Sequence, residues 1–377
     1  MPPVTSQAVA GFAAAGFEPV REEFERNLAE RGEVGASFAV VRDGELVVDL
    51  WGGIADEATG QRWHDDTLQV VFSGTKGFVA VCLLLLVERG LLKLEAPVSR
   101  YWPGFAKDEI RVRDVAAHTA RLPGVDEPLS LEEALAGARP VELLEAQRPS
   151  DDPRADLCYH ALTYGWLCGE LVRRADGRTV GRFFAEEIAE PLGLEVWIGL
   201  PPEHEHRVST LALASDWPNS PHLREETFAA DPFVGSIWGN PPFFSRVSFP
   251  CNRPAFHQAE IPAVGGIGTA RSIARLYEGL GSILSAETLQ LGRTTLSEGW
   301  DSAHAGPVRF GVGFQLQTET MRFGPVPDAF GHDGAGGSVH GSWPEQGLGF
   351  SYAMNLLRDD AQDRRSLALL EALYSSL

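Results

Sequence analysis

Lysine is nearly absent from this sequence of 377 residues. Only Lys76, Lys93 and Lys107 are lysines among its 32 basic residues, and the others are arginines. An arginine guanidinium stays protonated in proteins, whereas a lysine amine that is removed from water gives up its proton readily. A lysine inside an apolar segment is therefore the first residue to consider as a base.

Positive charge as a whole is also scarce. The 32 basic residues stand against 52 acidic ones, which gives a formal net charge of −20 at pH 7. Binding to nucleic acids or to anionic membrane surfaces depends on clustered positive charge. We therefore predict that the partners of this protein include neither a nucleic acid nor a membrane.

Cysteine and long apolar runs are few as well. The four cysteines form no C-x-x-C pair, which excludes zinc-ribbon spacing. Four cysteines are also too few for a disulfide framework in a chain of this length. The longest apolar run, residues 78–87, is too short to cross a bilayer, and residues 1–19 lack the basic start of a signal peptide. These absences predict a cytoplasmic protein that holds no metal and no cofactor.

Both ends of the chain carry strand patterns. Residues 37–53 form two β-branched runs around Asp43-Gly44, a pair typical of a tight hairpin turn. Residues 18–33 repeat an apolar residue every fourth position, which predicts an amphipathic helix. Further strands are predicted within 308–317, 337–343 and 348–356, and a closing helix at 361–376.

The middle of the chain is rich in helical patterns, at 131–146, 163–174 and 180–190. The predicted fold class is therefore α+β, an α/β sandwich. One antiparallel sheet, flanked by helices, is expected from residues 1–96 and 301–377, and a mainly helical domain from residues 97–300 is inserted between them.

The most informative motif is S-G-T-K at residues 73–76. It opens an apolar segment, 73–89, that predicts a buried helix with Ser73 as its N-cap. Residues three apart share a helix face, so the Ser73 hydroxyl and the Lys76 amine can meet. A poorly hydrated amine is a base, and such a pair is an activated nucleophile. The alternative interpretation is a capping serine with a surface lysine one turn along.

Two further elements accompany this motif. Tyr159 lies in the sequence LCYHALTYGWLCGELV, where a tyrosine beside an ammonium can reach its phenolate form and relay a proton. His332, Asp333 and Gly334 begin a glycine-dense stretch, and glycines at a strand edge let a ligand approach the backbone. Each alone is also explained as a core tyrosine or a hairpin turn.

Taken together and in this order, the three elements resemble the serine β-lactamase and penicillin-binding-protein superfamily. The likeness is strongest to the class C β-lactamase-like branch that includes family VIII carboxylesterases. It extends over residues 15–375 and includes VFSGTKGFVA, VAAHTARLPG and FGHDGAGGS.

The resemblance implies a role for each residue. Ser73 is the nucleophile, Lys76 accepts its proton, and Tyr159 shares or relays that proton. The backbone N–H groups of Ser73 and Ala335 form the oxyanion hole. His332, Asp333 and Gly334 occupy the place of the lactamase Lys-Thr-Gly and are expected to contact substrate.

The sequence departs from the lactamase pattern at two positions that affect the substrate. Ala161 stands where lactamases carry the Asn of Tyr-x-Asn, and His332 replaces a lysine that attracts a carboxylate. Both changes favour neutral esters over penicillins. The implied function is a serine carboxylesterase acting on short-chain or aryl esters.

Residues 232–250 combine aromatic residues with Pro and Gly, as a loop over an apolar cleft does. Trp238 and Phe243 of this segment, together with Trp343, are therefore predicted to line an apolar cleft.

Several alternatives remain open from the sequence. The same site suits an acyltransferase, a β-lactamase or D-aminopeptidase-type amide hydrolase, or a sensor module that is acylated without turnover. A Ser-His-Asp hydrolase would use His118 or His340 as its base, although no G-x-S-x-G motif is present. His204 and His206 form the one H-x-H pair that a metal hydrolase would need, and a charged surface turn explains it better.

Overall fold

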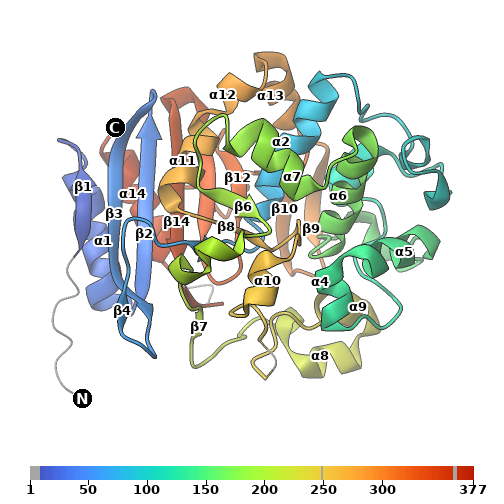
Figure 1. Cartoon of the computed structure of the whole chain (residues 1–377), viewed down its shortest axis with the longest axis horizontal. Coiled ribbons are helices and arrows are strands. Elements are labelled where there is room, and N and C mark those ends of the chain that lie inside the picture. Colours follow the sequence, from blue (N-terminus) through green and yellow to red (C-terminus); the bar gives the residue numbers. More distant parts are fainter. Residues whose placement is uncertain (1–8, 248, 360–362) are drawn as a thin grey trace.

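A large antiparallel sheet, built from both ends of the chain, organises the molecule (Figure 1). The computed structural model describes residues 9–247, 249–359 and 363–377. The sheet runs in the order β1-β3-β2-β14-β13-β12-β11-β10-β9, with β4 paired to β3. Its strands are β1 (Ala10–Ala13), β2 (Gly35–Arg42), β3 (Glu45–Asp56), β4 (Gln61–Arg62), β9 (Ser297–Asp301), β10 (Gly306–Phe310), β11 (Gln315–Leu316), β12 (Phe330–Asp333), β13 (Val339–Trp343) and β14 (Leu348–Met354).

The two ends of the chain meet where β2 pairs with β14. This antiparallel register runs over seven residue pairs, from Arg42 opposite Leu348 to Ala36 opposite Met354. The predicted hairpin is confirmed on the other side of β2, because Asp43 and Gly44 take the left-handed φ values of 50° and 82° that a tight turn between β2 and β3 requires.

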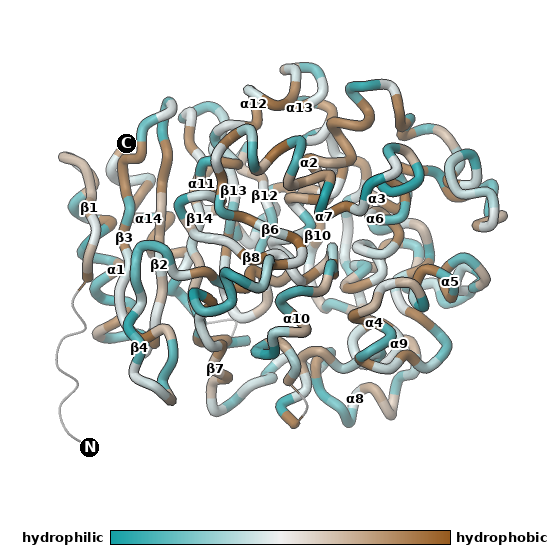
Figure 2. Tube along the Cα trace, in the orientation of Figure 1, coloured by the Kyte–Doolittle hydropathy of each residue, from teal (hydrophilic) through white to brown (hydrophobic). Residues whose placement is uncertain are grey.

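Helices cover both faces of this sheet. The predicted amphipathic helix is confirmed as α1 (Glu18–Glu30), which buries Val20, Phe24 and Leu28 beside α14 (Arg365–Ser375). The other face receives α11 (Ala270–Glu278), which packs on β2, β13 and β14. Hydrophobic residues mark the stretches of β2 and β3 that lie between these layers (Figure 2). The sheet is therefore the middle layer of a helix–sheet–helix sandwich, as predicted.

The remaining helices pack around α2 (Thr75–Glu88), which is the most buried helix of the fold. Nearly all of its residues are buried, and it contacts α6, α7, α13 and β12. Among the described residues, no helix has both the length and the apolar character needed to cross a membrane. The other helices are α3 (Val112–Ala116), α4 (Leu131–Ala136), α5 (Ala138–Ala146), α6 (Thr163–Asp176), α7 (Val180–Phe184), α8 (Glu225–Ala230), α9 (Pro232–Trp238), α10 (Pro254–Gln258), α12 (Leu280–Ile283) and α13 (Ala286–Gly292).

Short strands join the helical part to the sheet part. β5 (Gln69–Val70), β8 (Gly266–Gly268) and β6 (Val196–Ile198) form a small sheet that leads directly into the segment before α2. β7 (Ala212–Leu213) pairs with β15 (Leu356–Leu357). The division into residues 1–96 with 301–377 and residues 97–300 stays a prediction, and the sheet layer draws on β9 and α11 from the part assigned to the insertion.

Candidate active site

Ser73 and Lys76 meet at the beginning of α2. Ser73 lies in the turn before the helix and is partly exposed, whereas the Lys76 side chain is fully buried. The Nζ of Lys76 lies 3.1 Å from the Oγ of Ser73. Gly74, not Ser73, is the N-cap, and the Ser73 hydroxyl makes no capping bond, so the predicted capping role is wrong. The alternative interpretation, in which Lys76 is a surface lysine, is also wrong, because the Lys76 side chain is fully buried.

The backbone before the nucleophile candidate is strained. Phe72 has a φ of 45°, which is unfavourable for a bulky residue with a Cβ atom and costs about 1–3 kcal/mol. Its ring is held 5.6 Å from that of Phe244. The surrounding packing therefore maintains a turn that keeps the Ser73 hydroxyl at the surface of the site.

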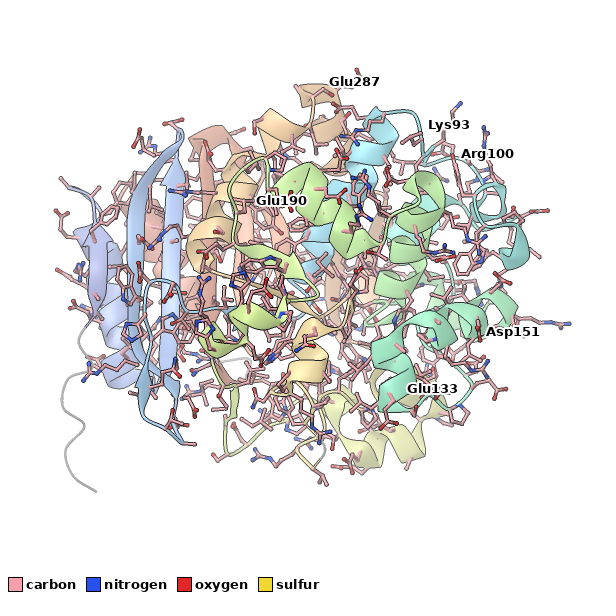
Figure 3. All side chains as sticks on the ribbon, in the orientation of Figure 1. Lys93, Arg100, Glu133, Asp151, Glu190 and Glu287 are labelled. Atoms are coloured by element: carbon pink, nitrogen blue, oxygen red, sulfur yellow. The ribbon has the colours of Figure 1, made fainter. Side chains whose placement is uncertain are left out.

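The three lysines differ in how they use their amines. Lys93 is exposed on the outer surface (Figure 3). Lys107 is buried and donates to three backbone carbonyls, of Phe105, Leu144 and Glu145, which matches the three N–H bonds of an ammonium.

Lys76 has a different set of partners. It donates to only two carbonyls, of Ala161 at 2.8 Å and of Ala263 at 3.0 Å. A neutral amine has two N–H bonds and one lone pair. The Ser73 Oγ is the third polar neighbour of the amine, so in the neutral form two N–H bonds serve the carbonyls and the lone pair is left for the Ser73 hydroxyl.

Burial favours this neutral form of Lys76. Loss of hydration holds the pKa of the Lys76 amine well below its ordinary value, and the negative charge of Asp333 opposes that shift only in part. The amine is therefore available as a proton acceptor at a pH where an exposed lysine is charged.

Tyr159 lies against the same amine. The Lys76 Nζ is 4.7 Å from the centre of the Tyr159 ring. Burial raises the pKa of the Tyr159 phenol well above its ordinary value, Asp333 and Asp301 act in the same direction, and the contact of its hydroxyl with Ser73 acts against them. The expected ease of reaching the phenolate is therefore wrong, because the neutral phenol is the stable form here. The expected roles of Tyr159 in passing on a proton and of Lys76 in holding it stay predictions.

The glycine-dense segment packs against the chain that leads to Ser73. β12 ends at Asp333, and a Cβ atom on Gly334 would lie 2.3 Å from the carbonyl oxygen of Val71. Within the described part of the chain, the N–H groups of Ser73 and Ala335 donate to no protein acceptor. Two free amides at adjoining turns are what an oxyanion requires.

A buried arginine contacts the backbone of the turn that follows Ala335. Arg365, at the beginning of α14, donates to the carbonyl of Gly336 at 3.0 Å and forms ion pairs with Glu33 and Asp363. Its side chain is 1% exposed. Because the guanidinium is itself held by these carboxylates, its bond to Gly336 ties the segment after Ala335 to the beginning of α14.

The close approach of Gly334 leads to a testable prediction. Gly334→Ala would place a methyl group against Val71 and force the two turns apart, so we expect kcat for ester hydrolysis to fall by about 100-fold. Gly281→Ala is the matched control, since a Cβ atom there meets nothing within 4 Å. A kcat for Gly334→Ala within twofold of the parent would contradict this account of the turn.

His332 and Asp333 lie near Tyr159 and Lys76, and their expected contact with substrate stays a prediction. The His332 ring is fully buried, 6.1 Å from the ring of Tyr159, and its Nε2 atom has no hydrogen-bond partner among the described residues. Burial, with the nearby Lys76, lowers the pKa of His332 to about 4, so the imidazole is neutral near pH 7. The Asp333 carboxylate is already paired with Arg322 at 3.2 Å.

Of the three aromatic residues predicted to line a cleft, only Trp238 lies beside Tyr159. Trp238, at the end of α9, lies 6.1 Å from the Tyr159 ring. Phe243 instead packs on Phe256 in the interior, and its neighbour Phe244 contacts Trp238.

Trp343 is not at the site, so its prediction as a wall is wrong. Alternate residues of a strand face opposite sides of the sheet, and Trp343 of β13 points with Val339 toward the layer of α1 and α14. Its ring lies 6.2 Å from that of Tyr374.

Three residues near Tyr159 were missed from the sequence. The ring of His304 lies 5.8 Å from the ring of Tyr159, and the ring of His222 lies 4.9 Å from that of Trp238. The Asp301 carboxylate accepts the Tyr159 N–H at 2.6 Å. Asp301 and His304 belong to the β9–β10 hairpin and His222 to a distant turn, and none carries a motif, so only the fold brings them beside Tyr159.

The rival nucleophile systems find no support in the geometry. Within the described ranges, neither His118 nor His340 pairs with a carboxylate or with Ser73; His118 accepts the His160 N–H, and His340 bonds to Ser351. His204 stacks on Trp197 at the surface. No group of three metal-ligating side chains occurs in the same described ranges.

Comparison with known proteins places the chain in a family. The model of the Beta-lactamase family matches residues 20–373. The chain belongs to the beta-lactamase family. Esterase/beta-lactamase LipL of Mycobacterium tuberculosis is a 33% identical relative over 383 residues, covering 94% of this chain and 85% of LipL.

Two solved structures resemble the fold closely. The crystal structure of a family VIII carboxylesterase aligns with a TM-score of 0.88 and 32% identity, covering 98% of this chain and all of the other. A penicillin-binding-protein homologue from Caulobacter crescentus aligns with a TM-score of 0.87 and 33% identity, over 98% and 100% of the two chains. The predicted superfamily and fold class are confirmed.

Proposed function

We propose that this chain is a serine carboxylesterase that cleaves small neutral esters through an acyl-enzyme on Ser73. The observation that carries the proposal is the fully buried Lys76 amine, which lies 3.1 Å from the Ser73 hydroxyl and otherwise contacts two backbone carbonyls. Relatives named esterase and carboxylesterase over most of the chain support the same reaction.

The proposed reaction has two steps. The Ser73 oxygen attacks the ester carbonyl while its proton moves to Lys76, and the carbonyl oxygen takes up negative charge beside the N–H groups of Ser73 and Ala335. The ester C–O bond then breaks, and the alcohol leaves with the proton returned by way of Tyr159. Water, activated by the same pair, releases the acid and restores Ser73.

The substrate preference follows from what surrounds the nucleophile. Ala161 has no side-chain amide with which to bind a lactam side chain, and neutral His332 attracts a carboxylate less than a lysine would. Trp238 and Phe244 offer apolar surface to an acyl or aryl group. These features favour uncharged esters over penicillins.

The test is a panel of p-nitrophenyl acetate, p-nitrophenyl butyrate and the lactam nitrocefin. We expect steady turnover of the esters, little opening of nitrocefin, and a loss of roughly a thousandfold or more in Ser73→Ala. A single burst without turnover would favour an acylated sensor, and nitrocefin rates equal to the ester rates would refute the preference. Ester products formed with an added alcohol would identify an acyltransferase.

A cytoplasmic location is part of the proposal. The four cysteines, Cys82, Cys158, Cys168 and Cys251, are all buried free thiols. Burial raises the pKa of the Cys82 and Cys168 thiols, which keeps them unreactive. Thiols of this kind suit a reducing compartment.

A further inference from the structure

The segment that carries Tyr159 is held by its backbone although it is neither helix nor strand. The N–H of Cys158 donates to the carbonyl of His118 at 3.2 Å, and the N–H of His160 donates to the Nδ1 atom of His118 at 3.0 Å. Between them, the N–H of Tyr159 donates to the Asp301 carboxylate at 2.6 Å. Three consecutive amides are thus fixed by only two residues, both distant in sequence.

Asp301 is an unusual partner for this segment. It ends β9, is fully buried, and has no cation within ion-pair distance among the described residues. Its second carboxylate oxygen accepts the N–H groups of Ala303 at 2.9 Å and His304 at 3.1 Å. Burying a carboxylate is costly unless several hydrogen bonds compensate. Here all three compensating donors are backbone N–H groups, one of Tyr159 itself and two of the turn that follows Asp301.

His118 supports the segment from the opposite side. It follows α3, has a left-handed φ of 63°, and places its ring 4.9 Å from that of Tyr159. Because its Nδ1 atom accepts a hydrogen bond, its other ring nitrogen carries the proton. Burial lowers the pKa of His118 well below its ordinary value, so this acceptor persists at neutral pH.

We propose that Asp301 and His118 are positioning residues that together fix the Tyr159 phenol over the Lys76–Ser73 pair. This inference rests on the proposed function, in which Tyr159 passes the proton to the leaving alcohol. The sheet edge supplies Asp301 and the helical part supplies His118, so the proton path is assembled only where these two parts of the fold meet.

Asp301 also acts on the phenol through its charge. Its negative charge disfavours the tyrosinate and so helps to raise the pKa of Tyr159. An asparagine would keep the size of the side chain but remove the charge, and its NH2 group would oppose one of the backbone N–H groups. Both the position and the acidity of Tyr159 would then change.

The test is Asp301→Asn, assayed with p-nitrophenyl butyrate per active site titrated with a fluorophosphonate. We expect kcat to fall about 10- to 100-fold, KM to stay within about threefold, and the alkaline limit of kcat to move to lower pH. Asp56→Asn is the matched control, since Asp56 also accepts a backbone N–H, from Ala58, but far from the site. A kcat within twofold and an unmoved pH profile would overturn the proposal.

Two further variants keep the result interpretable. If Asp301→Asn does not fold, His118→Asn tests the same support, with the same split between kcat and KM expected and a normal kcat overturning it. Ser73→Ala and Tyr159→Phe are assayed in parallel. Activity retained in Ser73→Ala refutes the proposed function itself, whereas inactive Ser73→Ala and Tyr159→Phe beside a normal Asp301→Asn refute only this inference.

Discussion

Lys76→Met is expected to lower kcat for p-nitrophenyl butyrate by about a thousandfold. Methionine keeps most of the volume of the buried side chain but has no lone pair basic enough to take the Ser73 proton, and loss of a general base typically costs 10²- to 10⁴-fold. KM is expected to change little, because the amine lies behind the nucleophile and is fully buried. Steady-state kinetics against the parent enzyme measure both values.

Lys107→Met is the control for this variant. Lys107 is also buried and also donates to backbone carbonyls, but it joins its own loop to the last turn of α5 and makes no contact with Ser73. We expect that variant to lose stability while keeping kcat. Equal activity of Lys76→Met and the parent enzyme would remove Lys76 from the proposed mechanism.

Between pH 7 and pH 5, the buried histidines His160, His332 and His340 are together expected to contribute a loss of roughly 4–6 kcal/mol of folding stability. Burial lowers the pKa of His160 and His332 to about 4 and that of His340 to about 3, against an ordinary value of 6.5. Below 6.5 the unfolded chain therefore binds protons that the folded chain does not, and stability falls by about 1.4 kcal/mol per pH unit for each histidine. Urea unfolding at several pH values measures the loss.

Single variants isolate this effect from opposing ones. The raised pKa values of Glu33 and Asp49 act in the opposite direction, because those carboxylates take up protons earlier in the folded state. His340→Asn is expected to lose about 2 kcal/mol less than the parent between pH 7 and pH 5, whereas exposed His64→Asn is expected to follow the parent. Parallel curves for all three proteins would contradict the assignment to buried imidazoles.

The sequence alone was enough to predict those features that depend on residues close together in the chain. Spacing within 73–76 placed a hydroxyl and an amine on one face, and the structure has them in contact. The apolar character of residues 73–89 predicted helix α2. The pair Asp43-Gly44 predicted the hairpin between β2 and β3. Motif order added Tyr159, which lies against the same amine. The chemical roles of these residues stay predictions until the variants are measured.

Other features depend on contacts that no local pattern carries. Trp343 was misplaced because its strand was predicted without knowing which of its faces turns toward the site. Phe243 and Phe244 differ by one position, and only the packed loop decides between them. The phenol was expected to ionise easily because burial of Tyr159 was not visible in the sequence. Asp301 reaches Tyr159 across 142 residues.

The pairing of β2 with β14 has a consequence for synthesis on the ribosome. Strand β2 emerges early, but its partner on that side is made some 300 residues later. Until then the nascent hairpin presents an unpaired edge, and an exposed edge strand is a template for pairing with another chain. Closing so long a loop is also slow, since pairing of distant segments delays folding. We therefore expect that covering this edge during translation increases the amount of protein recovered in folded form.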